Sequence, residues 1–214
     1  NDFSFYRPDL AIVVTDPLRA GHALRYHPGE ANLRMADVVV VNKVDSADLA
    51  AVAEVVGNVE RVNPRATIVR AASPVALEPG PSLVGARVLV VEDGPTLTHG
   101  GMPFGAGTVA ARQAGAGALV DPRPFAVGSI RGVFDRYPAI GPVLPAMGYD
   151  DAQLADLEAT IRATACDVVV TGTPVDLARL ISPGHPVRRA QYDLQEIGTP
   201  TLDAVLAPVI AKAR

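Results

Sequence analysis

Four consecutive residues, Asn42, Lys43, Val44 and Asp45, follow the aliphatic segment 38–41 and form the pattern N-K-x-D. The Asp45 carboxylate can accept two hydrogen bonds, which suits the ring N–H and the exocyclic amine of guanine but not adenine. The Asn42 amide suits the other edge of the base, and the aliphatic stem of Lys43 suits the ring face. The pattern therefore predicts a guanine-binding loop. The alternative is a chance tetrapeptide whose Asn and Asp only cap the next helix.

Two other loops are expected at the same edge of a parallel sheet, because such sheets bind ligands at the carboxyl ends of their strands. Asp16 follows the aliphatic segment 10–15, and Ala71, Ala72 and Ser73 follow segment 67–70. We expect Asp16 to contribute to nucleotide binding and the 71–73 loop to offer a backbone N–H to the base oxygen. The small residues at 71–73 are equally explained by a tight turn before Pro74.

A glycine-rich segment, residues 92–107, lies between a predicted strand and a predicted helix. Its backbone N–H groups, hydroxyls and helix N-terminus predict a phosphate or phosphorylated-substrate site. The residues assigned to that site are Thr96, Thr98, His99, Gly100 and Gly101. Glycine-rich segments also arise wherever the chain turns tightly.

Candidate metal ligands are few. Glu92 and Asp93 offer carboxylate oxygens of the kind that Mg²⁺ prefers. His22 and His27 lie in the polar segment 15–32, but a spacing of five places them poorly on one helical face. A solvated loop is the simpler interpretation of that segment.

The elements that must position these residues follow a repeating order of short aliphatic segment, turn and helical pattern. This order predicts an α/β fold with doubly wound, mostly parallel sheets. Residues 78–82, with two prolines and a glycine, predict a boundary between a nucleotide-binding domain at 1–80 and a Rossmann-like domain at 82–214. The alternative interpretation of residues 78–82 is a long surface loop. Predicted strands are 10–15, 37–41, 67–70, 87–91, 118–120, 167–170 and 187–192. Predicted helices are 46–62, 108–116, 129–137, 150–163, 174–181 and 201–212.

Composition excludes several classes of protein. The net charge is −4 and no segment concentrates Lys and Arg, which argues against a nucleic-acid partner. No apolar run approaches the roughly 18 residues of a membrane span, and the first residues of the sequence do not show a signal-peptide pattern. These features predict a cytoplasmic protein with no membrane partner. The single cysteine, Cys166, precedes an aliphatic run and is expected to be a buried, inert thiol.

A phosphate-binding loop of the form G-x-x-x-x-G-K-[ST] does not occur in these 214 residues, which begin at Asn1 and not at Met. We therefore expect the chain to be a piece of a longer protein whose N-terminal half holds the phosphates. The chain alone is predicted to be inactive, and no catalytic residue can be assigned in it.

Several strings together carry a resemblance to a known family. They are N-D-F-S-F-Y-R-P-D at 1–9, N-K-V-D at 42–45, D-G-P-T-L-T-H-G-G-M at 93–102 and G-P-V-L-P-A-M-G-Y at 141–149. The chain resembles the C-terminal half of predicted GTPases that are often labelled cyclic 2,3-diphosphoglycerate synthetase. The resemblance implies the back part of a P-loop NTPase-like domain followed by a Rossmann-like domain.

Motif and resemblance together imply an NTP-dependent ligase that acts on a small phosphorylated acid. GTP is the preferred nucleotide and ATP the other candidate, with Mg²⁺ as the metal. Expected partners are the nucleotide, the phosphorylated substrate, the N-terminal half of the same protein and, as an open alternative, a second copy. The other function considered is a regulatory or metallochaperone-type GTPase, in which His22, His27 and His99 would bind metal.

Overall fold

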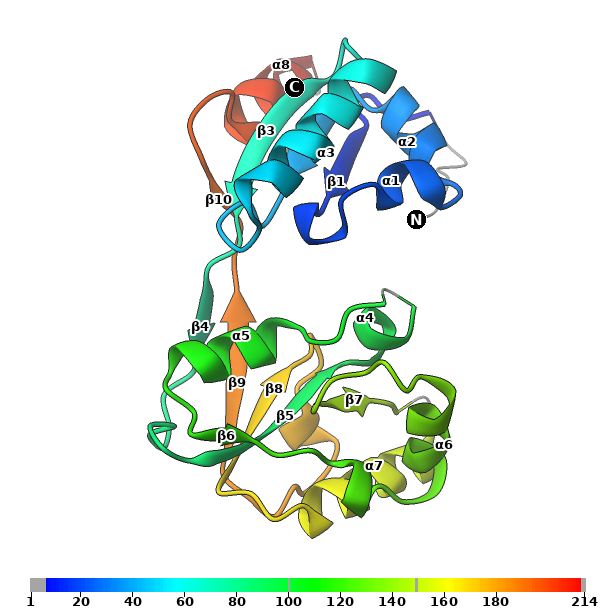
Figure 1. Ribbon diagram of the computed structural model, residues 1–214. Helices are drawn as coiled ribbons and strands as arrows, with labels where there is room; N and C mark the ends of the chain where they lie inside the picture. Colours follow the sequence, from blue (N-terminus) through cyan, green and yellow to red (C-terminus); the bar gives the residue numbers. More distant parts are fainter. Residues whose placement is uncertain (1–6, 100, 149, 213–214) are drawn as a thin grey trace. The chain divides into compact units, whose positions relative to one another are not determined.

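The polypeptide divides into two compact units. The computed structural model describes residues 7–99, 101–148 and 150–212 (Figure 1). The first unit comprises residues 1–74 and 193–214, and the second comprises residues 75–192. The chain therefore leaves the first unit after residue 74 and returns to it at residue 193.

The first unit is built on a four-stranded sheet with the order β1-β2-β3-β10. Strands β1 (Ile12–Thr15), β2 (Val38–Val41) and β3 (Thr67–Ala72) run parallel, and β10 (Gln195–Glu196) pairs antiparallel with β3. All four residues of β2 are buried, as expected for a central strand covered on both faces.

Helices cover the two faces of this sheet. On one face, Val39 and Val41 pack with buried residues of α2 (Gly29–Met35) and α3 (Leu49–Val62). On the other, Val38 and Val40 pack with Leu202 and Val205 of α8 (Leu202–Lys212). Two short helices, η1 (Pro17–Arg19) and α1 (His22–Arg25), follow β1.

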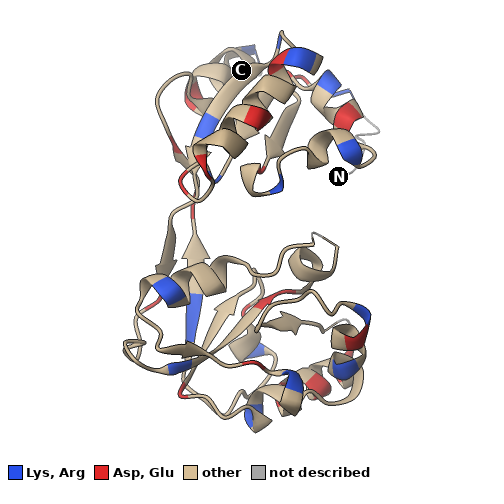
Figure 2. Cartoon of the chain, viewed as in Figure 1, with Lys and Arg blue, Asp and Glu red and all other residues tan. Residues whose placement is uncertain are grey.

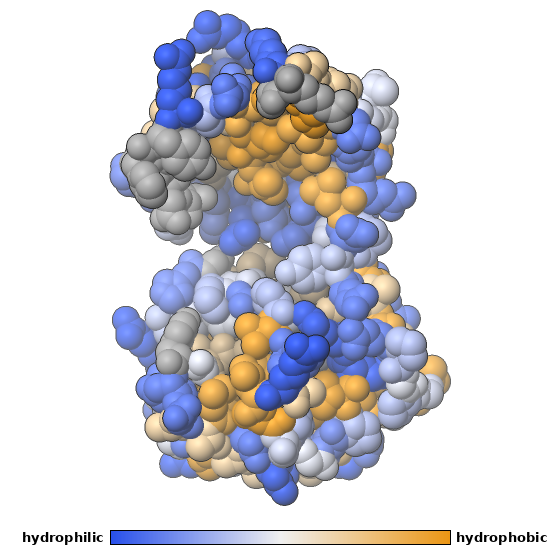
Figure 3. Space-filling view, turned by 180° about the vertical axis from the view of Figure 1, so that it is seen from behind, coloured by the Kyte–Doolittle hydropathy of each residue, from blue (hydrophilic) through white to orange (hydrophobic). Residues whose placement is uncertain are grey.

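The apolar cover of the α8 face does not extend fully over β1. Ile12 and Val14 are paired in register with Val38 and Val40, yet they are 40% and 61% exposed. Figure 3 shows apolar surface gathered on the first unit in this view from behind.

Charged residues of both signs are interspersed over each unit (Figure 2).

The second unit contains a larger sheet with the order β4-β9-β8-β5-β6, and β7 pairs with the end of β5. Five of these strands run parallel to one another: β5 (Arg87–Asp93), β6 (Ala118–Leu119), β7 (Leu144–Ala146), β8 (Val168–Gly172) and β9 (Val187–Tyr192). Strand β4 (Val75–Leu77) pairs antiparallel with β9. The buried residues 88–91 and 168–170 form the centre of its core.

The helices of the second unit are α4 (Gly94–Thr98), α5 (Ala106–Gln113), α6 (Gly128–Arg136) and α7 (Asp151–Ala163), with the short η2 (Arg123–Phe125) and η3 (Leu177–Arg179). Helix α5 packs across β5, β8 and β9, and α6 packs against α7. Parallel-dominant sheets with helices on both sides confirm the predicted α/β, doubly wound fold. Within the described residues, no helix combines the length and apolar character needed to cross a membrane.

The division of the chain differs from the boundary predicted at 78–82. Strand β4 pairs with β9, so residues 75–77 already belong to the second sheet. The proline-rich turn lies inside this unit, where the Arg188 guanidinium donates to the carbonyl oxygens of Glu78 and Pro81. The predicted domain 82–214 also ends too late, because residues 193–214 return to the first unit.

Candidate functional site

The N-K-x-D loop follows β2 and is joined by backbone hydrogen bonds to both neighbouring strands. The Asn42 N–H donates to the carbonyl oxygen of Thr15 at 3.0 Å, and the Val44 N–H donates to that of Ala71 at 3.1 Å. The structure thus brings the ends of β1, β2 and β3 together, as the sequence predicts for a parallel sheet. The loop is fixed by main-chain contacts before any side chain is considered.

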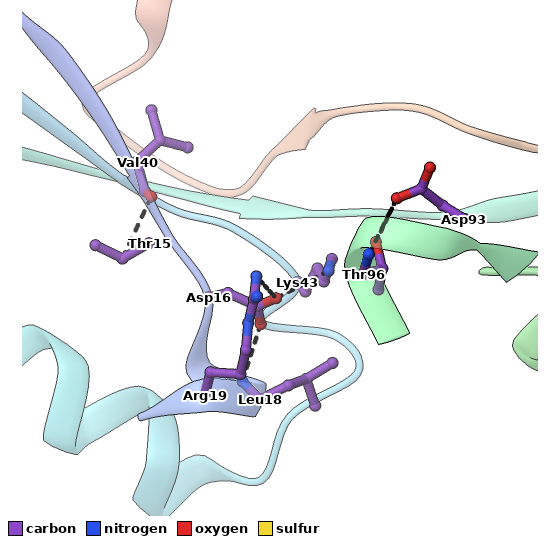
Figure 4. Close-up of polar contacts among 8 residues, drawn as sticks. All are labelled: Thr15, Asp16, Leu18, Arg19, Val40, Lys43, Asp93 and Thr96. Atoms are coloured by element: carbon purple, nitrogen blue, oxygen red, sulfur yellow. Dashed lines mark hydrogen bonds and ion pairs between the residues drawn. The ribbon is translucent and has the colours of Figure 1, made fainter. Parts of the chain in front are cut away.

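Lys43 has an unusual backbone conformation for a residue with a side chain. Its φ is +60°, and no other described non-glycine residue has a positive φ. The left-handed region costs an L-residue roughly 1–2 kcal/mol, and such residues cluster at functional sites. The Lys43 Nζ donates to Asp16 Oδ2 at 2.9 Å, so a contact across two strand ends accompanies the strained backbone (Figure 4).

Asp16 is the centre of a small polar cluster. Its Oδ1 accepts a hydrogen bond from the Leu18 N–H at 3.0 Å, and its Oδ2 lies 3.3 Å from Arg19 Nη2 in addition to Lys43 (Figure 4). The side chain of Asp16 is only 12% exposed. The structure therefore places Asp16 beside Lys43, in contact with protein donors.

Asp45 is held by the loop after β3. Its Oδ1 accepts a hydrogen bond from the Ser73 N–H at 3.0 Å, while the residue as a whole is exposed. The Ser73 N–H is thus committed to Asp45, whereas the sequence prediction has a backbone N–H of residues 71–73 donating to the base. Ala71 and Ala72 belong to β3 and lie opposite Glu196 and Gln195 of β10. In this structure the 71–73 segment supports the carboxylate that is predicted to bind the base.

Asn42 carries an orphaned polar atom. Its Oδ1 is buried and has no hydrogen-bond partner among the described residues. A buried acceptor without a donor costs about 1–3 kcal/mol, so this oxygen lowers the stability of the loop in the conformation described.

The second predicted site is organised around Glu92, the penultimate residue of β5. Its carboxylate is fully buried and accepts four hydrogen bonds at the N-terminus of α5: from the N–H groups of Gly105, Gly107 and Thr108, at 2.9, 3.1 and 2.7 Å, and from the Thr108 hydroxyl, at 2.8 Å. Burial raises the pKa of Glu92 above the ordinary range of a glutamate, and these hydrogen bonds oppose the shift. Glu92 acts as a buried helix cap, so its geometry does not support the prediction of a magnesium ligand.

Three glycines make room for this carboxylate. A Cβ at Gly105 would lie 2.6 Å from Glu92 Oε2, and one at Gly172 would lie 2.2 Å from the same atom. A Cβ at Gly107 would lie 3.0 Å from a methyl of Val90 and 3.1 Å from the Gly172 nitrogen. Part of the glycine content that predicts phosphate binding is therefore explained by packing around Glu92.

The residues around α4 also contact one another. Asp93 Oδ2 accepts hydrogen bonds from the Thr96 N–H at 3.2 Å and the Thr96 hydroxyl at 2.9 Å, which makes Asp93 a helix cap (Figure 4). The Thr98 hydroxyl lies 2.9 Å from the Gly94 carbonyl oxygen and 2.9 Å from His99 Nδ1. Gly101 is exposed, and Gly100 lies outside the described residues. Phosphate binding by this segment stays a prediction.

The histidine-based metal site finds no support in the contacts. Within residues 7–99, 101–148 and 150–212, no three side chains of His, Cys, Asp or Glu are grouped so that they could hold a metal ion. His22 packs against the Tyr26 ring, with 4.8 Å between the ring centroids.

Sequence reasoning missed the role of Arg19 and the capping role of Glu92. The signal for Arg19 is its spacing of three from Asp16, which suits a contact within one helical turn. The signal for Glu92 is a carboxylate that ends a strand and precedes glycines near a helix start. Cys166 is buried, as predicted, and burial raises the pKa of its thiol.

The fold and the loop define the general class: an α/β protein with parallel sheets and an N-K-x-D loop at the carboxyl edge of one of them. No family model matches the chain. A curated relative from Thermococcus kodakarensis, named Arginine synthetase ArcE, is 54% identical over 206 residues. The match covers 96% of this chain but 46% of the relative, so the chain spans about half the length of that protein.

This relative overturns the predicted function. Motif and resemblance predict an enzyme of the cyclic 2,3-diphosphoglycerate synthetase type that acts on a small phosphorylated acid, with a regulatory or metallochaperone-type GTPase as the alternative. A protein with 54% identity to this chain is instead named for arginine synthesis. The prediction was wrong because an N-K-x-D loop carries no information on the second substrate. The strings at 93–102 and 141–149 carried the substrate assignment only by resemblance.

Proposed function

We propose that this chain is part of a nucleotide-dependent ligase that forms arginine. The observation that carries the proposal is the 54% identity to Arginine synthetase ArcE over nearly the whole of this chain. Building a guanidinium group requires a new carbon–nitrogen bond, and cleavage of a nucleotide phosphoanhydride is a suitable source of driving force for that step. The second substrate is accordingly an amino acid and not a phosphorylated acid.

The first unit is proposed to bind the nucleotide base. Asp45 is exposed, and Ser73 occupies one of the approximately four lone-pair positions of its carboxylate, which leaves acceptor capacity for the two donors of guanine. Asn42 is assigned to the other edge of the base, where guanine presents acceptors and the amide N–H₂ of asparagine can donate, and Lys43 offers its aliphatic stem. GTP is the nucleotide that these residues favour, with ATP as the alternative.

Mg²⁺ is proposed to accompany the nucleotide, since it binds phosphate oxygens together with one or two carboxylates. Glu92 and Asp93 are not used in this proposal, because both carboxylates are engaged as helix caps. Within the part of the chain that the structure describes, no group of three or more His, Cys, Asp or Glu side chains could hold the ion without the phosphates.

The base assignment is tested by Asp45→Asn in the full-length protein. An asparagine retains an acceptor for the Ser73 N–H and places an amide donor where xanthine carries its extra carbonyl. We expect GTP binding to weaken by about 10- to 100-fold, as for loss of hydrogen bonds to a charged group, and XTP binding to improve. Isothermal titration calorimetry with GTP, XTP and ATP measures all three affinities.

The matched control is Asp48→Asn. Asp48 is an exposed carboxylate that accepts a hydrogen bond from the Ala51 N–H and caps α3, and asparagine serves equally well as an N-cap. This control should bind like the wild type. An unchanged preference between GTP and XTP in Asp45→Asn would defeat the base assignment.

The arginine-forming activity needs its own assay. Full-length protein, Mg²⁺ and either GTP or ATP are incubated with candidate amino-acid precursors and ammonia, and arginine is measured by mass spectrometry. Arginine formation that depends on nucleotide supports the proposal. Nucleotide hydrolysis without arginine from any precursor would count against it.

A further inference from the structure

The contact between Lys43 and Asp16 joins the predicted base-binding loop to the end of β1. Lys43 Nζ lies 2.9 Å from Asp16 Oδ2, although the two residues are 27 positions apart in sequence. The Asp16 side chain is 12% exposed and that of Lys43 is 38% exposed, so the pair is more shielded than a surface ion pair. Such shielding strengthens the attraction between the charges.

Asp16 is fixed on its own side of the contact. Its Oδ1 accepts a hydrogen bond from the Leu18 N–H in the turn that begins η1, and Pro17 is buried. Arg19 supplies a second cation at 3.3 Å from Oδ2. Both carboxylate oxygens therefore already have protein donors, and the position of Asp16 is set by the start of this short helix.

The contact with Asp16 orients the Lys43 side chain. With φ at +60°, its backbone is in a region that side-chain-bearing residues rarely adopt, and a four-carbon stem is otherwise free to move. Holding the ammonium at Asp16 stretches the stem between the loop and β1. An aliphatic stem fixed at both ends is suited to pack against a flat ring.

We propose that Asp16 is a positioning residue of the base site: it acts through Lys43 and does not itself contact the nucleotide. This inference rests on the proposed nucleotide-binding function. It changes the role expected for Asp16 from the sequence, where this carboxylate is assigned to nucleotide binding directly.

The two carboxylates of the site then have separable effects. The stem of Lys43 can pack against any purine ring. Loss of Asp16 therefore lowers the affinity for guanine and for adenine nucleotides by the same factor. Asp45 pairs with donors that adenine lacks, so its loss changes the preference between bases. A common loss of affinity with unchanged preference is the signature of the positioning role.

The experiment is a double-mutant cycle in the full-length protein with Asp16→Asn, Lys43→Met and both together. Methionine keeps an unbranched apolar side chain and removes the ammonium. GTP and ATP affinities are measured by isothermal titration calorimetry, with and without Mg²⁺, and Asp48→Asn is the control for the chemical change. We expect Asp16→Asn to lower the affinity for both nucleotides about two- to tenfold. In the Lys43→Met background, the same change should have no further effect.

Three results would overturn the inference. If Asp16→Asn still lowers nucleotide affinity in the Lys43→Met background, Asp16 contacts the ligand itself. If the loss of affinity appears only with Mg²⁺, Asp16 contacts the metal. An affinity that Asp16→Asn leaves unchanged would show that Lys43 needs no positioning. If wild-type protein binds neither GTP nor ATP, the proposed function itself fails, and that outcome is distinct from all three.

Discussion

Glu92 is a single buried carboxylate that determines how one end of the second unit is built. It receives four hydrogen bonds from residues 105–108, at the end of α5 where the helix dipole is positive. A phosphate at the same helix end would have to displace this side chain. The N-terminus of α5 is therefore already occupied by a carboxyl group of the protein itself.

The Glu92→Gln substitution tests this arrangement. Glutamine directs an amide N–H₂ at one of the four donors, so we expect the free energy of unfolding to fall by about 1–3 kcal/mol. Thermal or urea denaturation followed by circular dichroism measures the change. Unfolding free energies equal to those of the wild type would contradict the assigned role.

The pH dependence has a definite sign. Burial raises the pKa of Glu92 in the folded protein, so the folded state binds this proton more tightly than the unfolded chain does. The contribution of Glu92 to the unfolding free energy is therefore largest below its unfolded pKa and decreases as pH rises through the folded pKa. The stability difference between wild type and Glu92→Gln should narrow as pH rises above the ordinary titration range of a glutamate, and a widening difference would contradict the assignment.

At the scale of residues, the sequence predicted the neighbours of the N-K-x-D loop better than their roles. Asp16, Asp45 and Ser73 do meet at one edge, because parallel strands bring their carboxyl ends together. The capping role of Glu92 could not be predicted in the same way. It depends on Gly172, which lies opposite Glu92 on a neighbouring strand but 80 positions away in sequence.

At the scale of elements, buried strands and long helices were predictable, and short ones were not. Strands β2, β5 and β8 are aliphatic runs that admit one interpretation. The predicted helix 174–181 is wrong: only η3 forms there, and the Thr173 hydroxyl accepts a hydrogen bond from Val175 in a local turn. The capping pattern was present, but Leu177 and Ile181 alone supply a buried face too small to stabilise a full helix.

The packing of α5 on the sheet depends on glycine at one strand position. A Cβ on Gly172 would lie 2.2 Å from Glu92 Oε2 and 2.4 Å from the Gly107 nitrogen. We expect Gly172→Ala to lower the free energy of unfolding of the second unit by about 3 kcal/mol, since either the helix or the carboxylate must move. Denaturation monitored by circular dichroism measures this loss.

The matched control is Gly132→Ala in the same unit. Gly132 lies inside α6, and a Cβ there would meet nothing within 4 Å. This change should raise the unfolding free energy by about 1 kcal/mol, as helix propensity predicts. Equal effects of the two alanines would show that steric contact around Glu92 is not what requires glycine at 172.

At the scale of the whole molecule, the first unit is made of two separate stretches of chain. The second unit has a hydrophobic core of its own, formed within residues 75–192. We expect residues 75–192, expressed alone, to unfold in one cooperative thermal transition. A gradual loss of ellipticity without a transition would show that this unit needs the rest of the chain.

The first unit should also fold when the second is removed. Asp193 N–H donates to the carbonyl oxygen of Pro74 at 3.2 Å, so the two ends left by the excision are adjacent. A chain that joins residues 7–74 to 193–212 through a short glycine–serine linker should retain a cooperative transition. Residues 7–74 alone should not, because Val38, Val40, Val69 and Ala71 would lose α8.

The arrangement of α8 fixes an order of events during synthesis. Strands β1 to β3 emerge from the ribosome early, but the helix that covers one face of their sheet is translated after the entire second unit. At roughly 5–20 residues per second, that delay is on the order of ten seconds. The unit that carries the N-K-x-D loop is therefore completed after the second unit, and one apolar face of its sheet lacks its helical cover in the meantime.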